Sequence, residues 1–184
     1  TTLFRSDGID AIIAADSGMD FLYENSVTPD IIVGDFDSAT TKALEFFERK
    51  GQTEIHRLNP IKDDTDTEYA IRLAISEGAR SIVMLGATGS RIDHVLGNIS
   101  LLGIGLESKT DISIIDTNNR IRMSDKPVTI EKSAQYGRFV SLIALTDDNE
   151  VSLKGFKYPV TDYSFDRFTS LGISNEIVDD QDRK

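Results

Sequence analysis

The chain reads Asp30-Ile31-Ile32-Val33-Gly34-Asp35-Phe36-Asp37-Ser38 over residues 30–38. Its apolar, β-branched start predicts a buried strand, and Gly34 lets the backbone turn where that strand ends. Asp35 and Asp37 then bring two like charges together, which is costly unless a cation or a shared proton relieves the repulsion. Carboxylate oxygens of this kind suit Mg²⁺. A lone pair of aspartates could also be a solvated loop, so the rest of the chain has to decide between the two interpretations.

The order of strand, loop and helix repeats along the chain up to about residue 116. This alternation predicts a parallel sheet flanked by helices. The expected strands lie at residues 9–15, 30–33, 54–58, 81–85 and 111–116. Helical periodicity follows four of them, near residues 19–23, 40–50, 66–77 and 95–106.

The alternation of strands and helices ends at a linker at residues 123–127, and no helical periodicity follows it. Short strands separated by turns are expected there, at residues 128–130, 139–145, 151–153 and 173–178. The predicted fold class is therefore α/β, with a mainly parallel α/β/α domain at residues 1–122. A smaller all-β sandwich domain is expected at residues 123–184.

Composition narrows the classes of function. The chain has 184 residues, with 20 basic against 31 acidic side chains and a net charge of −11. This balance argues against a nucleic-acid binder, whose affinity comes mainly from Lys and Arg on phosphates. The chain has no cysteine, and we see no signal peptide and no apolar run long enough to span a membrane. We therefore expect a cytoplasmic protein that contacts neither membrane nor nucleic acid.

Four polar clusters occupy equivalent places, directly after an expected strand or in the loop that enters the next helix. They are Asp16, the pair Asp35 and Asp37, residues 63–66, and the group Arg91, Asp93 and His94. Ligands of open parallel sheets bind in the crevice at the carboxyl ends of the strands. Clusters that are distant in sequence are thus expected to be neighbours in space.

Each cluster also has a structural interpretation. The aspartates at residues 63–66 could complement the dipole of the following helix, worth up to about 1 kcal/mol, and this is as good an explanation as a metal site. Residues 86–89 could form a simple turn, although free amides at a helix start also bind phosphate and Arg91 offers a fork matched to its oxygens. His94 alone would usually be structural, and its place beside Arg91 favours function. His56 is expected to be structural.

Together these segments resemble the motifs of thiamine pyrophosphokinases in order and spacing. The matching segments are Ala15-Asp16-Ser17-Gly18, residues 34–38, Lys62-Asp63-Asp64-Thr65-Asp66-Thr67-Glu68, residues 91–94 and Thr169-Ser170-Leu171-Gly172-Ile173-Ser174-Asn175-Glu176. The resemblance extends from about Asp10 to Glu176. It implies transfer of pyrophosphate from ATP to the hydroxyl of thiamine, with Mg²⁺ as cofactor, AMP as the second product and a homodimer of two-domain chains.

The resemblance also implies roles for individual residues. Catalysis would fall to Asp35, Asp37, Asp63 and Asp66, and Asp16, Asp35, Asp37 and Asp63 would hold the metal. The ATP side would comprise Asp16, Ser17, Gly34, Ser38, Lys62, Thr65, Arg91, Asp93 and His94. Thr169, Ser170, Ser174 and Asn175 would approach thiamine. Asp37 or Asp63 would accept the proton of the attacking alcohol.

The sequence departs from the family pattern in places. Ser17 and Ser90 stand where glycine is common, and a strand usual at each end of the family fold is not evident. The chain has no tryptophan to stack on thiamine, which leaves Tyr158, Phe165 and Phe168 as candidates. Two other functions fit the acidic clusters: a Mg²⁺-dependent phosphohydrolase of a small phosphorylated metabolite, and a non-catalytic sensor of nucleotide or thiamine.

Overall fold

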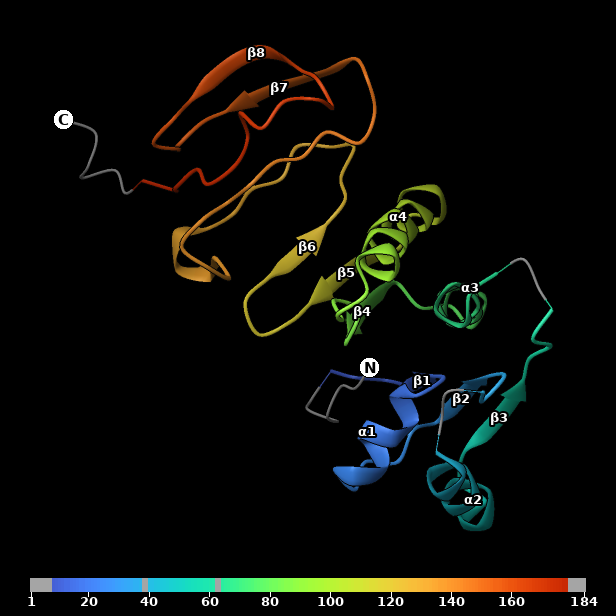
Figure 1. The fold of residues 1–184 in the computed structure, drawn as a ribbon. Helices are drawn as coiled ribbons and strands as arrows, with labels where there is room; N and C mark the ends of the chain where they lie inside the picture. Colours follow the sequence, from blue (N-terminus) through green and yellow to red (C-terminus); the bar gives the residue numbers. More distant parts are fainter. Residues whose placement is uncertain (1–7, 38–39, 62–63, 179–184) are drawn as a thin grey trace. The chain divides into compact units, whose positions relative to one another are not determined.

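The computed structural model describes residues 8–37, 40–61 and 64–178. The chain divides into two compact units, Thr1–Lys126 and Pro127–Lys184 (Figure 1). The boundary was expected after residue 122, the last residue of strand β6 (Arg120–Arg122), whereas the two units divide after Lys126. No helix in the described part of the chain has both the length and the apolar character that crossing a bilayer requires.

The first unit opens with a parallel three-stranded sheet in the order β1 (Ile13–Ala15), β2 (Ile31–Gly34) and β3 (Glu54–Arg57). Ala15 lies opposite Val33, and Gly34 lies opposite Arg57. Because the strands run in one direction, the loops that follow β1, β2 and β3 leave from the same edge of the sheet. The expected parallel arrangement is confirmed for these strands.

Helices α1 (Gly18–Glu24) and α2 (Thr41–Lys50) cover one face of this sheet. The buried residues of this core come from every second strand position and from one side of each helix: Ile12, Ala14, Met19, Leu22, Ile32, Ala43 and Phe47. Each large side chain of this set contributes about 1.5–3 kcal/mol of hydrophobic stabilisation. The left-handed backbone at Gly51 (φ 62°) ends α2, in the capping position expected from the sequence.

A second sheet consists of β4 (Ser81–Leu85), β5 (Asp111–Ile115) and β6. Strands β4 and β5 are parallel, whereas β6 adds antiparallel to β5. The sequence did not predict β6, because its three residues Arg-Ile-Arg are too few and too polar to show a strand pattern. An antiparallel edge on a parallel sheet is common and leaves the mainly parallel class intact.

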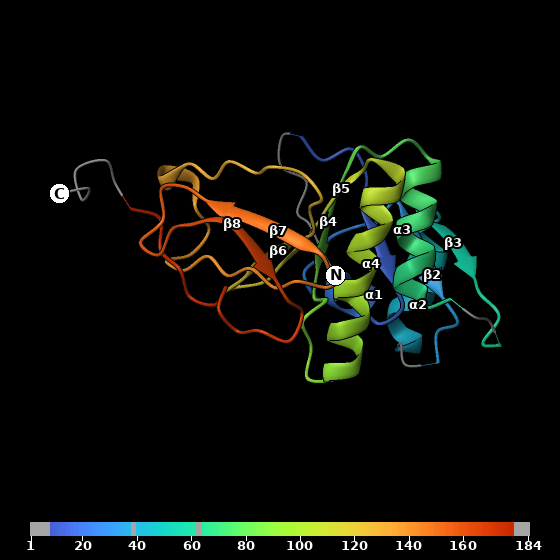
Figure 2. The ribbon, with the colours of Figure 1, turned by 90° about the horizontal axis from the view of Figure 1, so that it is seen from above.

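Helix α3 (Asp66–Ser76) joins the two sheets. It packs on β1 and β2 and also contacts α4 (Ile92–Ser108), which covers β5. Figures 1 and 2 both show α3 and α4 side by side. His56 lies between Glu54 (Nε2 to Oε1, 2.7 Å) and the hydroxyl of Tyr69 on α3 (3.2 Å), so its ring connects β3 to α3.

The second unit contains β7 (Asn149–Leu153) and β8 (Val160–Phe165), which pair antiparallel. Isolated bridges join Val140 to Asn175 and Phe156 to Ile177. Its only helical turn among the described residues is η1 (Lys132–Ala134). The predicted class, an α/β unit followed by a smaller β-rich one, is confirmed.

Individual strands of this unit differ from the expectation. Residues 128–130 form no strand, and residues 139–145 and 173–178 form only bridges. Apolar β-branched composition predicted these strands, but a strand also needs a paired neighbour, and Val128 and Ile143 instead remain 55% and 71% exposed. Strand β8 was missed because its alternation breaks at Asp162, which has positive φ (47°) opposite a register shift in β7.

Two glycines of α4 provide a matched test of its packing. A Cβ at Gly105 would lie 2.6 Å from the carbonyl oxygen of Thr110 and 2.9 Å from Ile112, whereas a Cβ at Gly97 would meet nothing within 4 Å. We expect Gly105→Ala to lower the free energy of unfolding by about 1–2 kcal/mol, because overpacking outweighs the gain in helix propensity. Gly97→Ala should raise it by up to about 1 kcal/mol. Urea unfolding followed by helical circular dichroism measures both, and equal effects would contradict the packing.

Candidate active site

Three carboxylates from two adjacent strand ends form a cluster. Asp16 follows β1, and Asp35 and Asp37 follow β2. One carboxylate oxygen from each lies within 4.8 Å of the other two. Asp16 and Asp35 are half-buried and Asp37 is exposed. The structure therefore brings together three residues that are up to 21 positions apart in the sequence.

The backbone of this cluster is held in an uncommon conformation. Asp16 and Phe36 both have positive φ, 46° and 64°. The amide of Asp16 donates to the carbonyl of Val33 (2.8 Å), and the amide of Asp37 donates to Oδ1 of Asp35 (3.2 Å). Left-handed backbone costs a residue with a side chain of order 1 kcal/mol or more, and such strain concentrates at functional sites.

Gly34 permits the close approach of the two loops. A Cβ at this position would lie 3.2 Å from Cα of Asp16 and 3.2 Å from the ring of Phe36. The same ring lies under the guanidinium of Arg57 at 5.4 Å, a cation–π contact that ties the loop to the end of β3. The glycine expected on the ATP side thus has a steric reason to be there.

The donor set fits a small divalent cation. Mg²⁺ takes oxygen ligands at 2.0–2.1 Å, so two ligand atoms on opposite sides of the ion are about 4.2 Å apart. Three oxygens that all lie within 4.8 Å of one another are therefore close to the separations that one such ion requires. Without a cation their charges repel one another.

The segment before α3 is only partly described. Thr65 caps α3, and its Oγ1 accepts a hydrogen bond from the amide of Glu68 (3.2 Å). Asp66 lies in the first turn of α3, where a carboxylate complements the helix dipole. Asp66 does not belong to the three-carboxylate cluster found among the described residues. Ser38, Lys62 and Asp63, three expected site residues, lie outside the described residues.

The loop after β4 carries the expected basic group. Arg91 precedes α4 and forms a two-bond ion pair with Asp93, Nη2 to Oδ2 at 2.6 Å and Nε to Oδ1 at 3.2 Å. This ion pair lowers the pKa of Asp93 to about 2. Arg91, Asp93 and His94 are all exposed. The guanidinium therefore stays accessible while Asp93 fixes its direction.

Two residues that sequence reasoning missed hold the same loop. Thr88 donates its hydroxyl to Oδ2 of Asp116 (2.8 Å), and Asn98 of α4 donates to the carbonyl of Ala87 (2.9 Å). Asp116 follows β5 as Asp16 follows β1. This placement at a strand end is the signal that could have identified it.

The expected thiamine-side residues form turns in the second unit. Asn175 is 7% exposed, and its side chain bonds both backbone groups of Tyr158: Oδ1 accepts from the amide (3.1 Å) and Nδ2 donates to the carbonyl (2.8 Å). Ser174 has positive φ (62°), and its amide donates to Oγ of Ser141 (3.0 Å). Thr169 Oγ1 accepts from the amide of Leu171 (3.2 Å), and the carbonyl of Ser170 accepts from Ile173 (3.2 Å).

Three aromatic residues, Tyr158, Phe165 and Phe168, were candidates for stacking on thiamine, and burial excludes one of them. Phe165 is 4% exposed and fills the space beside Gly172, where an added Cβ would lie 2.5 Å from the Phe165 ring. Tyr158 and Phe168 are 62% and 86% exposed. The backbone of Tyr158 is held at both its amide and its carbonyl by the buried side chain of Asn175, whereas the backbone of Phe168 is held at its amide by Asp166 (2.6 Å).

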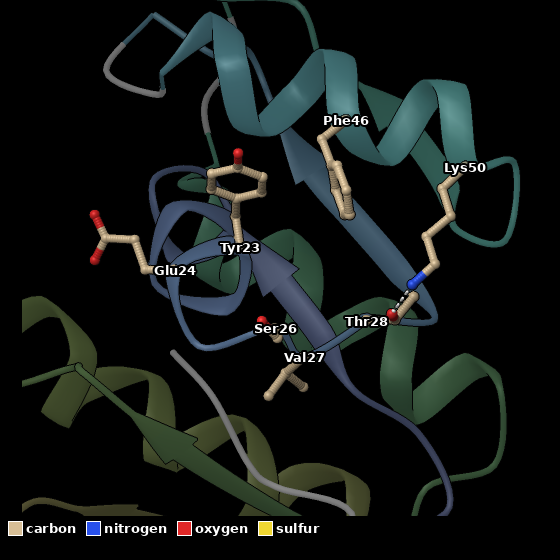
Figure 3. Close-up of a pocket in the computed structure, with 7 residues that line it drawn as sticks. All are labelled: Tyr23, Glu24, Ser26, Val27, Thr28, Phe46 and Lys50. Atoms are coloured by element: carbon tan, nitrogen blue, oxygen red, sulfur yellow. Dashed lines mark hydrogen bonds between the residues drawn. The ribbon is translucent and has the colours of Figure 1, made fainter.

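A hollow of about 420 Å³ lies elsewhere on the first unit (Figure 3). Its walls include Tyr23 and Phe46, whose rings meet edge to face at 5.1 Å, and Lys50, which donates to Oγ1 of Thr28 (2.6 Å). The loop of Thr28 leads into β2, whereas Asp35 follows the other end of that strand. The hollow therefore belongs to the amino end of β2 and is separate from the carboxylate cluster.

Each of the two units matches a family of known proteins. The family model described as "Thiamin pyrophosphokinase, catalytic domain" matches residues 6–115. The one described as "Thiamin pyrophosphokinase, vitamin B1 binding domain" matches residues 127–183. A thiamine pyrophosphokinase of Bacillus subtilis (strain 168) is 35% identical over 168 residues, which cover 90% of this chain and 78% of the relative.

Solved structures agree with these matches. A crystal structure of thiamine pyrophosphokinase from Bacillus subtilis superposes with a TM-score of 0.82 at 34% identity, covering 91% of this chain and 78% of that one. One from Geobacillus thermodenitrificans gives a TM-score of 0.75 at 31% identity, covering 94% and 80%. The Candida albicans enzyme, at 20% identity and a TM-score of 0.77 over 96% and 80%, has the same fold.

The carboxylate cluster predicts a coupling between cation binding and stability. In EDTA, we expect Asp35→Asn to melt at or above the wild-type temperature, because it removes one of three repelling charges. Millimolar Mg²⁺ should raise the melting temperature of the wild type and leave that of Asp35→Asn nearly unchanged. Thermal unfolding with and without Mg²⁺ measures this.

The control is Asp125→Asn, which removes the same charge from an exposed residue outside the cluster. It should respond to Mg²⁺ as the wild type does. An equal response of Asp35→Asn and Asp125→Asn would show that the ion binds elsewhere.

Proposed function

The chain belongs to the thiamin pyrophosphokinase family, enzymes that transfer pyrophosphate from ATP to thiamine, and we propose that it catalyses this transfer with Mg²⁺ held by Asp16, Asp35 and Asp37. The observation that carries the proposal is the meeting of these carboxylates within 4.8 Å at two neighbouring strand ends. They lie inside the segment that matches the catalytic domain. When bound, Mg²⁺ neutralises charge on the polyphosphate.

The reaction asks the protein for positioning and for charge neutralisation. The hydroxyl oxygen of thiamine forms a bond to the β-phosphorus of ATP, the bond from that phosphorus to the oxygen bridging to the α-phosphorus breaks, and AMP leaves. The hydroxyl proton would pass to a carboxylate, and of the two candidates, Asp37 and Asp63, the exposure of Asp37 within the cluster supports that choice. Arg91 offers its guanidinium to phosphate oxygens, and Asp93 orients it.

Other residues of the matching motifs are proposed to complete the nucleotide side. Thr65 and Asp66 begin α3, and a free amide at a helix start favours an anion. The remaining proposed contacts are Ser17, Gly34, Ser38, Lys62, Asp63 and His94.

For the thiamine side we propose Tyr158 as the ring that stacks on the substrate. Both rings are exposed, and the two hydrogen bonds between the backbone of Tyr158 and the buried side chain of Asn175 support this choice over Phe168. Asn175 would then act mainly by holding Tyr158. Thr169, Ser170 and Ser174 would line the same region of the second unit, which matches the vitamin B1 binding domain.

We also propose that the chain forms a homodimer through its second unit. Among the described residues of that unit, nine large apolar side chains are at least 47% exposed: Val128, Tyr136, Phe139, Ile143, Leu145, Tyr158, Phe168, Leu171 and Ile173. So many exposed apolar residues in a small unit are typical of an interaction surface. The cytoplasmic location expected from the sequence stays a prediction.

Incubation with ATP, Mg²⁺ and thiamine tests the activity directly. We expect AMP and thiamine diphosphate in equal amounts, formed only when thiamine is present. Asp35→Asn should lower turnover by at least about 100-fold, because the cation is held less well. Phosphate release without thiamine would instead indicate the phosphohydrolase, and binding without turnover would indicate the sensor.

Mixed dimers test whether a site takes residues from two chains. If the carboxylates come from one chain and Tyr158 from the other, a dimer of Asp35→Asn with Tyr158→Ala has one intact site and one with both substitutions. Random exchange makes about half the dimers mixed, so about a quarter of wild-type activity should return. The assay uses thiamine at a concentration where Tyr158→Ala alone is inactive. No recovery after exchange verified by native mass spectrometry would place the site within one chain.

A further inference from the structure

Asp116 connects the ends of two neighbouring strands. It directly follows β5, whose last residue, Ile115, lies opposite Leu85 at the end of β4. Its Oδ2 accepts the hydroxyl of Thr88, three residues beyond the end of β4 (2.8 Å). Its Oδ1 accepts the backbone amides of Asn118 (2.7 Å) and Asn119 (2.6 Å).

The loop after β4 is therefore held at two consecutive residues. Asn98, in the second turn of α4, donates to the carbonyl of Ala87, and Asp116 holds the side chain of Thr88. Ala87 is 6% exposed, so this part of the loop is packed as well as bonded. Only two residues separate Thr88 from Arg91, where the loop ends and α4 begins.

We propose that Asp116 is a positioning residue for the transfer: through Thr88 it sets the course of the loop after β4, so that Arg91 and the first turn of α4 meet the polyphosphate of ATP. This inference rests on the proposed function, because it takes Arg91 to be a phosphate ligand. The role of Asp116 at the end of β5 is to position the loop after β4, whereas the carboxylate cluster at β1 and β2 would bind the cation.

The hydrogen bonds of Asp116 favour a carboxylate at this position. Its neighbours Thr88, Asn118 and Asn119 all present donors, and Nδ2 of Asn119 reaches both oxygens at 3.1 Å. These donors lower the pKa of Asp116 to about 2, so it is charged at every pH at which the enzyme would work. A fixed negative charge would repel phosphate, which suits a residue that acts through Thr88 better than one that touches ATP.

Thr88→Val separates positioning from folding. It removes the hydroxyl, keeps the shape of the side chain and leaves the bonds of Asp116 to Asn118 and Asn119 in place. We expect the Kd for the ATP–Mg²⁺ complex and the KM for ATP to rise about 10-fold, the loss of one hydrogen bond to a charged group. The KM for thiamine should stay near that of the wild type, and the melting temperature should fall by only a few degrees, because one hydrogen bond within the protein is lost.

Three further variants complete the experiment. Thr88→Ser keeps the hydroxyl and should recover most of the affinity for nucleotide. Thr117→Val makes the same change at an exposed residue next to Asp116; it removes only the acceptor of the side-chain amide of Asn118 (3.2 Å) and should have no effect on nucleotide affinity. Asp116→Ala, which unlike Asn leaves nothing for the hydroxyl of Thr88 to bond, should raise the Kd for ATP at least as much as Thr88→Val does, and the double variant should be no worse than Asp116→Ala, because both break the same link.

Nucleotide affinity is measured by titrating a fluorescent ATP analogue with Mg²⁺, which needs no turnover. A wild type that binds nucleotide but makes no AMP would refute the proposed function, and the variants would still test the role of Asp116. An unchanged Kd in Thr88→Val would overturn the inference, and so would equal rises in the KM for ATP and for thiamine. A wild type that binds no nucleotide would overturn both.

Discussion

The parallel pairing of β1 with β2 is the constraint on which the site depends. It ends the two strands side by side and so forces Asp16 against the pair Asp35 and Asp37. Crowded like charges lower stability unless a cation joins them. The local features of both loops serve this arrangement: Gly34 removes the side chain that would hold them apart, and the amide of Asp37 fixes Asp35.

The pair of strand ends at β4 and β5 is built differently. There the carboxylate of Asp116 is surrounded by donors, and the exposed guanidinium of Arg91, oriented by Asp93, follows in the same loop. One strand-end pair thus gathers carboxylates for a cation, whereas the other holds in place a loop that offers Arg91 to an anion. A polyphosphate that carries a divalent ion needs both kinds of contact, which is why the proposed function draws on both sheets of the first unit.

Local sequence patterns predicted the positions of several strands and the end of one helix, because these depend on neighbouring residues. Apolar β-branched runs gave the positions of β2, β4 and β5, and Gly51 gave the end of α2. Pairing between distant segments was not predictable: β6 and β8 were missed, and residues 128–130 were wrongly expected to be a strand. In the site, the meeting of Asp16, Asp35 and Asp37 follows from parallel topology. The hydrogen bonds from Thr88 to Asp116 and from Asn175 to Tyr158 could not be predicted, because they depend on the directions of side chains, which a sequence pattern does not give.

The left-handed backbone at Phe36 has a consequence for how fast the cation can enter. Residues 34–37 are shaped by their own dihedral angles, by the hydrogen bond from the amide of Asp37 to Oδ1 of Asp35 and by the contact between the Phe36 ring and Arg57. An arriving ion would therefore meet oxygens of Asp16, Asp35 and Asp37 that are already close together, and these residues would not have to be gathered first. The slow step of metal entry would then be the loss of water from Mg²⁺ itself, an ion that dehydrates reluctantly.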